Sequence, residues 1–155
     1  MTAAVVSIPL GSTPASATAL AGTCYDINLH TTGKVHAFTG LDCRTGDLGA
    51  DVGNDSDWGA SGGGFSGGDT NAAYSVLNNG YDEGKSVVAL YDYTAYSWDW
   101  GYACLKTGDW APDLSKFSFS PRIYEQNKRY NMGGAISSHQ WVYESACAPE
   151  YIIAD

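Results

Sequence analysis

The run from Val87 to Trp110, VVALYDYTAYSWDWGYACLKTGDW, crowds aromatic and β-branched residues into about two dozen positions. Such residues pack well on the pleated, half-buried surface of a sheet, and no apolar spacing of three and four residues marks a helix here. Asp92 and Asp99 interrupt the run, and Gly101 and Gly108 supply turns. The run therefore predicts core strands, and a 155-residue chain with 19 glycines is expected to be all-β.

Weaker strand signals flank this run on both sides. Alternating apolar residues predict two short strands in CYDINLH and KVHAF, and another at Tyr74–Leu77 before an Asn-Asn-Gly turn. The later expected strands lie within 87–93, 101–108, 111–119 and 135–143. The expected loops are 42–53, 54–70 and 125–134. A single helical turn is expected around Ala111–Lys116, started by Pro112 and Asp113.

The two halves of the chain repeat one plan. Each has a strand, a glycine turn, a second strand, a long loop and a final strand that contains serine, Ser75 in the first half and Ser137-Ser138 in the second. Four strands with one long return connection are the wiring of a Greek key. We therefore expect a single domain over 23–155, with a first Greek key at about 23–80 and a second at about 81–147.

The four cysteines predict an oxidising compartment. None lies in a C-x-x-C pair or near a histidine at zinc-finger spacing, which argues against structural zinc. Of three possible pairings we expect Cys24–Cys43 and Cys104–Cys147, one within each half. In the chain-entropy model, closing these loops stabilises the fold by about 3 and about 4 kcal/mol.

Residues 1–22 agree with export. The stretch TAAVVSIPLGSTPASATALAG carries no charge and ends in small-x-small triplets, as the end of a secretory signal does; a disordered tail is the alternative. No segment is long and apolar enough to span a bilayer. The formal charge of −9 disfavours nucleic acid and anionic membranes as partners, because binding phosphate needs clustered Lys and Arg. We expect a secreted, extracellular monomer.

The phrase VVALYDYTAYSWDWGYACLKTGDWAPDL, followed later by GGAISSHQWV, resembles the βγ-crystallin Greek-key motif. More closely, it resembles the bacterial secreted βγ-crystallin-like proteins grouped with a family of small peptidase inhibitors. Tyr91 and Tyr96 match the motif's aromatic pair, with Trp98 at its glycine position, and Ser137-Ser138 match its closing pair. In the first half Phe38 matches the opening aromatic, Cys43 replaces the second aromatic, and Gly46 follows one place late, while the closing segment has Asn71 and Ser75 in register. The resemblance covers roughly 24–143 and implies a sandwich of two Greek keys.

The family's calcium clamps are altered in this chain. The paired Asn/Asp positions fall on Gly133 and Gly134 in the second half and on Thr70 and Asn71 in the first, where Tyr74 also stands in place of the expected serine or threonine. Ca²⁺ needs six to eight oxygen ligands, and these positions have lost part of theirs. We therefore expect no cofactor, and calcium is the single cofactor that the sequence leaves possible. Outside these positions, four residues with side-chain oxygens lie close together in the sequence: Asp51, Asn54, Asp55 and Asp57. They are weak candidates for metal ligands, and the alternative is that they form a solvated acidic turn.

The sequence predicts no enzyme. Ser137, Ser138 and His139 are neighbours, but adjacent residues on a strand point to opposite faces. The glycine-rich GGGFSGG at 62–68 lacks the strand-to-helix elbow of a hydrolase and the lysine of a phosphate loop.

Binding functions remain. The resemblance implies a peptidase-inhibitor-like protein that presents a rigid exposed loop to an extracellular protease. The candidate loops are the Gly-rich, flexible Asn54–Asp69 and Glu125–Met132, in which Lys128 and Arg129 offer a basic anchor.

The alternative is an extracellular carbohydrate- or cell-wall-binding module in which Trp98, Trp100 and Trp110 stack on a polysaccharide. Because Asp99 separates Trp98 from Trp100 in an expected strand, both indoles are expected on one face. A toxin-like or structural extracellular protein is the third hypothesis.

Overall fold

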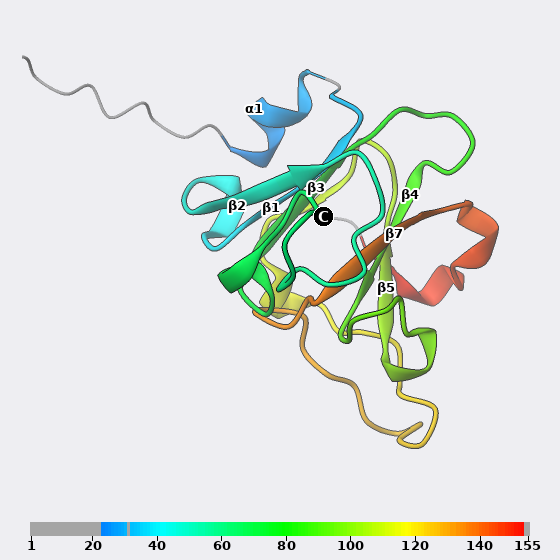
Figure 1. The fold of residues 1–155 in the computed structure, drawn as a ribbon. Helices are drawn as coiled ribbons and strands as arrows, with labels where there is room; N and C mark the ends of the chain where they lie inside the picture. Colours follow the sequence, from blue (N-terminus) through cyan, green and yellow to red (C-terminus); the bar gives the residue numbers. More distant parts are fainter. Residues whose placement is uncertain (1–22, 31, 154–155) are drawn as a thin grey trace, which may run out of the picture.

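The computed structural model describes residues 23–30 and 32–153 and contains two four-stranded sheets (Figure 1). The first sheet has the order β2-β1-β3-β6. Its strands are β1 (Lys34–Phe38), β2 (Asp47–Asp51), β3 (Ser75–Asn79) and β6 (Trp110–Ala111). The second sheet has the order β7-β4-β5-β8. Its strands are β4 (Val87–Tyr91), β5 (Tyr102–Leu105), β7 (Ser138–Val142) and β8 (Ile152–Ile153). The all-β prediction is confirmed.

Short helical segments connect the strands. They are the α-helix α1 (Cys24–Asn28) and the 3-10 turns η1 (Leu41–Cys43), η2 (Gly67–Asp69), η3 (Trp98–Trp100), η4 (Leu114–Lys116), η5 (Glu144–Ala146) and η6 (Pro149–Tyr151). No helix among the described residues has the length and apolarity needed to cross a bilayer. The predicted N-terminal signal-like segment, 1–22, lies outside the described residues.

Several predicted elements differ in the structure. CYDINLH begins a helix rather than a strand, because Thr23 forms a capping box in which its hydroxyl accepts from the Asp26 N–H and its own N–H donates to the Asp26 carboxylate. β2 and the short β8 occupy positions where no strand was predicted. The strand expected within 111–119 is reduced to β6 at its start and a single bridge between Ser118 and Asn131, while η4 supplies the predicted helical turn.

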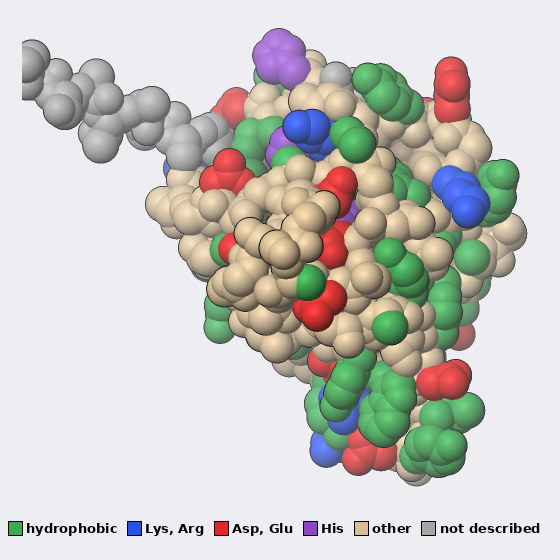
Figure 2. Space-filling model, in the orientation of Figure 1, with side chains coloured by type: hydrophobic (Ala, Val, Ile, Leu, Met, Phe, Trp, Pro, Cys, Tyr) green, Lys and Arg blue, Asp and Glu red, His purple; other side chains and the backbone are tan. Residues whose placement is uncertain are grey.

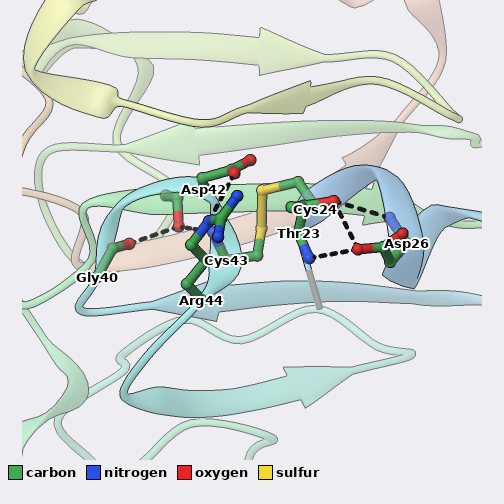
Figure 3. Close-up of a disulfide and its surroundings, with 8 residues drawn as sticks. Thr23, Cys24, Asp26, Gly40, Asp42, Cys43 and Arg44 are labelled. Atoms are coloured by element: carbon green, nitrogen blue, oxygen red, sulfur yellow. Dashed lines mark hydrogen bonds and ion pairs between the residues drawn. A yellow bond between two sulfur atoms is a disulfide. The ribbon is translucent and has the colours of Figure 1, made fainter. Parts of the chain in front are cut away.

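Both predicted disulfides are confirmed. Cys24 bonds to Cys43, with the two Cα atoms 4.9 Å apart, and this bond holds α1 against the turn that follows β1 (Figure 3). Cys104 bonds to Cys147 with a Cα separation of 6.3 Å and ties β5 to the C-terminal segment. Two disulfides are consistent with an oxidising extracellular location.

Each sheet includes a short segment from the other half of the chain. β6 belongs to the second half but pairs with β3 of the first sheet. Asp55 belongs to the first half but forms a bridge with His139 of β7, in which each backbone N–H donates to the other carbonyl at 3.0 and 2.9 Å. Because of this exchange, neither half completes its sheet alone. The main core lies between the sheets and buries Val35, Val76, Val88, Leu90 and Leu105.

The closing serines occupy equivalent places in the two halves. Ser75 lies opposite Phe38, and its hydroxyl donates to the Gly40 carbonyl at 2.7 Å. Ser138 lies opposite Tyr91, and its hydroxyl donates to the Tyr93 carbonyl at 2.7 Å. In each half, a buried serine, Ser75 on β3 or Ser138 on β7, thus fastens the turn that leaves the first strand of that half. This shared hydrogen bond explains physically why a serine stands at the same place in both halves.

The glycine-rich segment after β2 is anchored by two buried aromatic side chains, whereas the sequence predicted a flexible loop at 54–69. Trp58 and Phe65 are fully buried, and their rings stack with centroids 4.1 Å apart. The Trp58 indole N–H donates to His139 Nδ1 at 2.9 Å, and His139 Nε2 lies 2.9 Å from the Gly53 carbonyl. Burial of two rings outweighs the flexibility of the surrounding glycines, so the segment covers one end of the core.

We predict that Ser75→Ala lowers the free energy of unfolding by about 1–3 kcal/mol, because it leaves the buried Cys43 N–H without its acceptor. Ser138→Ala removes one hydroxyl bond and should cost about 0.5–1.5 kcal/mol. Urea unfolding measures both. Exposed Ser145→Ala is the control, and equal effects in all three variants would contradict the fastening role.

We also predict an acid-sensitive stability that depends on His139. Burial lowers the pKa of His139 below its ordinary value of 6.5, so the folded protein binds this proton less readily than the unfolded chain. The stability that depends on the neutral ring is therefore complete above about pH 6.5 and declines as the pH falls, by at most about 1.4 kcal/mol per pH unit.

Unfolding midpoints between about pH 7 and pH 5 test this dependence. His139→Gln should flatten the profile. Burial also lowers the pKa of His36, so His36→Gln is measured beside it to separate the contributions of the two histidines. A His139→Gln profile that keeps the full slope would refute the assignment.

Candidate functional site

Aromatic side chains gather where the turn between β4 and β5 meets the long loop after η4. We call this region the aromatic end; it comprises 91–102, 118–131 and Tyr151. Figure 1 shows the loop projecting below the sheets, and Figure 2 shows hydrophobic and charged side chains crowded on that projection. The large hydrophobic side chains that are exposed here are Tyr93, Trp100, Ile123 and Tyr124.

Arg122 is the organising side chain of the aromatic end. Its guanidinium carbon lies 3.5 Å from the ring centroid of Tyr130, 5.1 Å from that of Tyr93 and 5.8 Å from that of Trp100. Its Nη2 donates to the Asp92 carboxylate at 2.7 Å. A guanidinium stacks on aromatic rings and pairs with carboxylates at the same time, so one side chain holds the projecting loop against the β4–β5 turn.

Backbone bonds brace the projecting loop. The Phe119 N–H donates to the Tyr130 carbonyl at 3.0 Å, and the Ile123 N–H donates to the Asp99 carbonyl at 2.8 Å. The Glu125 N–H donates to the Arg122 carbonyl, which closes a tight turn. Ile123 and Tyr124 form the tip of this turn, and Tyr124 is 84% exposed. The tip is therefore an apolar group on a fixed support.

The aromatic end has two sides. On one side, Tyr93 and Trp100 lie with ring centroids 5.2 Å apart, and Tyr124 lies 6.5 Å from Trp100. On the other side is a cleft. Its lining includes the rings of Trp98, Tyr102 and Tyr151 and the polar side chains of Asp99, Ser120 and Gln126. The surface thus offers ring faces next to hydrogen-bonding groups.

Trp98 and Trp100 do not share one face, contrary to the sequence prediction. They lie in η3 rather than in a strand, because Ala95 and Tyr96 take positive φ values and turn the chain out of the extended conformation. Trp98 packs against Tyr102 at 4.4 Å on the cleft side, whereas Trp100 lies on the Arg122 side. The two indoles serve opposite sides of the same end.

The other predicted binding residues divide between two regions. Lys128 and Arg129 belong to the aromatic end, where the Lys128 ammonium lies 4.5 Å from the Tyr130 ring and the Arg129 guanidinium 5.3 Å from the Tyr151 ring. Trp110 lies apart from them, packed against the Cys24–Cys43 region with Tyr25 at 6.2 Å. It therefore cannot extend the same surface.

Arg122, Tyr124 and Tyr151 were missed by sequence reasoning. The alternation of basic and aromatic residues in PRIYEQNKRY was the signal that could have found the first two. Tyr151 gave no signal, because it reaches the cleft only through the parallel pairing of β8 with β5.

The predicted metal ligands are only partly assembled. No group of three or more His, Cys, Asp or Glu side chains that could hold a metal occurs within 23–30 and 32–153. At the family-type position, the Asn71 amide oxygen accepts a hydrogen bond from the Ser137 hydroxyl at 3.1 Å. Asp51 accepts from the Gly53 and Gly64 N–H groups, while Asn54, Asp55 and Asp57 line one small cavity.

Comparison with known proteins identifies the fold. No family model matches the chain, and no curated protein matches it in sequence. A solved structure described as "Evolution of the eye lens beta-gamma-crystallin domain fold" matches with a TM-score of 0.51 and 16% identity, over 74% of this chain and 91% of that chain. At this identity the match shows the fold alone. The chain has the βγ-crystallin domain fold, as the sequence resemblance implied.

We predict that Arg122→Gln destabilises the protein by about 2–3 kcal/mol, because Asp92 then keeps a largely buried charge without a partner. The expected loss of stability is smaller than for a fully buried ion pair, because the side chains of Arg122 and Asp92 remain 15% and 12% exposed. Adding Asp92→Asn should restore at least about 1 kcal/mol, measured by a double-mutant cycle in urea. Additive losses would show that the pair does not brace the loop.

Proposed function

We propose that the protein is a non-catalytic, extracellular polysaccharide-binding module whose binding surface is the aromatic end. The observation that carries this proposal is the fixed set of partly exposed rings, Tyr93, Trp100 and Tyr124, beside a cleft with polar side chains. Ring faces pack on the C–H surfaces of sugars, and the carboxylate and amide groups of Asp99 and Gln126 can bond to sugar hydroxyls.

Preorganisation supports this role. Arg122 fixes the exposed rings through its contacts with Tyr93 and Trp100, and the backbone bond from Ile123 to Asp99 fixes the tip. A surface that is already ordered loses little conformational entropy when it binds a ligand. The acidic chain, with a formal charge of −9, favours a neutral polymer over a strongly anionic one.

The peptidase-inhibitor hypothesis fits this geometry less well. A substrate-like loop would lie extended in a protease cleft, where its backbone adds a strand to the enzyme. The exposed tip at Ile123 and Tyr124 is instead a closed turn, and Lys128 makes contacts with Glu125 and Tyr130. The earlier candidate loop 54–69 is pinned by the buried rings of Trp58 and Phe65. Inhibition of a protease is therefore kept only as the alternative result of the binding experiment described below.

We predict that the protein is retained on at least one of insoluble chitin, cellulose and peptidoglycan. Trp100→Ala should weaken binding about tenfold or more, because it removes a stacking face near the centre of the surface. Depletion isotherms measure the affinity. The matched control is Tyr143→Ala, which removes a ring of similar exposure elsewhere on the molecule.

Equal binding by both variants would place the glycan surface elsewhere. Retention on none of the polymers, together with inhibition of a serine protease or metalloprotease at micromolar concentration, would replace the proposal with the inhibitor function. In that case, Tyr124→Ala would test whether the projecting tip contacts the protease.

A further inference from the structure

Asp55 has an unusual electrostatic environment. The residue is 6% exposed, and its Oδ1 accepts a hydrogen bond from the Asp57 N–H at 3.0 Å. Its Oδ2 is buried and finds no hydrogen-bond partner among the residues that the structure describes. A buried carboxylate oxygen without a hydrogen-bond donor or a counter-charge lowers the stability of the fold. A bound ligand could supply the partner that the described residues do not provide for Oδ2.

A small cavity lies beside this carboxylate. Asp55 lines it together with oxygen-bearing side chains of Asn54, Ser56, Asp57 and Ser61. One oxygen of Asp57 accepts from the Gly59 N–H, which leaves its second oxygen for another contact. Figure 2 shows acidic side chains gathered on the face that the glycine-rich loop covers.

Glycine keeps the cavity wall close to the unpaired oxygen. A Cβ atom added at Gly63 would lie 2.0 Å from Asp55 Oδ2, a distance that no real contact allows. Only a residue without a side chain can place its backbone there. Gly63 therefore has a local function, which is to let the backbone approach the Asp55 carboxylate.

No positive side chain balances this charge within the described residues. The ion pairs of the described chain involve other carboxylates, and neither Asp55 nor Asp57 takes part in one. His139 faces Asp55 through its backbone, but its ring is engaged by Trp58 and Gly53, and burial lowers its pKa. Asp51, at the end of the preceding strand β2, has its oxygens bonded to backbone N–H groups.

We propose that this cavity binds one calcium ion, with Asp55 Oδ2 and Asp57 as its carboxylate ligands. Hydroxyl, carbonyl and water oxygens complete the coordination, since Ca²⁺ accepts six to eight oxygens in irregular geometry. Zinc is disfavoured because the cavity offers neither thiolate nor imidazole. Two carboxylates predict weak binding, with a Kd of about 10⁻⁴–10⁻³ M, as is usual for extracellular modules.

The site lies outside the positions that match the family's calcium clamps, which centre on Asn71 and Gly134. Its consequence is structural, because Asp55 is also the residue that bridges to β7. An ion on Asp55 fixes the exchanged segment in the second sheet. The neighbouring Ser56 carbonyl accepts from the Ala95 N–H at 2.7 Å, so this segment also supports the β4–β5 turn. The calcium measurements below contain no polysaccharide, and they therefore test this proposal independently of polysaccharide binding.

The test is thermal unfolding of the whole protein in 10 mM CaCl₂, 10 mM MgCl₂ and NaCl of equal ionic strength, each after treatment with EDTA. Calcium should raise the Tm by about 3–10 °C, and magnesium should raise it less, because Mg²⁺ demands a rigid octahedral site. Calorimetric titration with CaCl₂ measures the stoichiometry, which should be one ion per chain.

Three variants locate the ion. Asp55→Asn should abolish the calcium response while matching or exceeding the wild-type Tm in EDTA, because it removes an uncompensated buried charge. Asp57→Asn keeps the bond to the Gly59 N–H and should weaken the response at least tenfold in calcium concentration. Asn71→Gly is the control, since Asn71 has a φ of 56° that glycine adopts freely, and its response should be unchanged.

Either of two results would overturn the proposal. A wild-type Tm that does not change with calcium would show that the protein binds no calcium ion. A response that survives Asp55→Asn but disappears in Asn71→Gly would place the ion between the closing segments of the two Greek keys instead.

Discussion

The exchange of short segments between the sheets is the constraint on which the structure depends. β6 completes the first sheet, and the segment at Asp55 caps the second through its bridge to His139. A second pair of bonds joins the halves symmetrically: the Asn71 N–H donates to the Ile136 carbonyl, and the Gly134 N–H donates to the Ala73 carbonyl, both at 2.8 Å. Since each half needs the other to satisfy its backbone, the two Greek keys should fold as one cooperative unit.

Buried polar side chains specify this arrangement more than apolar burial does. Asn78 is fully buried, yet its amide donates to the Ser86 and Leu105 carbonyls and its oxygen accepts from the Gly80 N–H. These bonds connect a strand of the first sheet with one of the second. Two sheets held together only by apolar contacts could shift relative to each other. The hydrogen bonds of the Asn78 amide form in only one relative position of the two strands.

The sequence predicted what depends on local pattern. The aromatic run gave core strands at β4 and β5, and the repeated serines gave two related halves. It could not predict the helix at Cys24–Asn28, where a capping box overrides the alternation of CYDIN. It also misjudged Asn78 and Asn79, which look like turn residues but end β3 because distant carbonyls satisfy their amides. The candidate site was half predicted, because η3 depends on positive φ values at Ala95 and Tyr96 that no periodicity reveals.

The two turns after the first strands explain why the proposed binding surface lies in the second half. Asp42 and Cys43 take positive φ values in the first turn, just as Ala95 and Tyr96 do in the second. In the first turn, Cys43 is bonded to α1, which covers the surface around it. Among the described residues no disulfide or α-helix covers the second turn, so its rings remain partly exposed, and Arg122 contacts two of them, Tyr93 and Trp100. One backbone geometry thus carries a disulfide in one half and the rings that we propose for recognition in the other, and Cys43 with its partner Cys24 marks the difference.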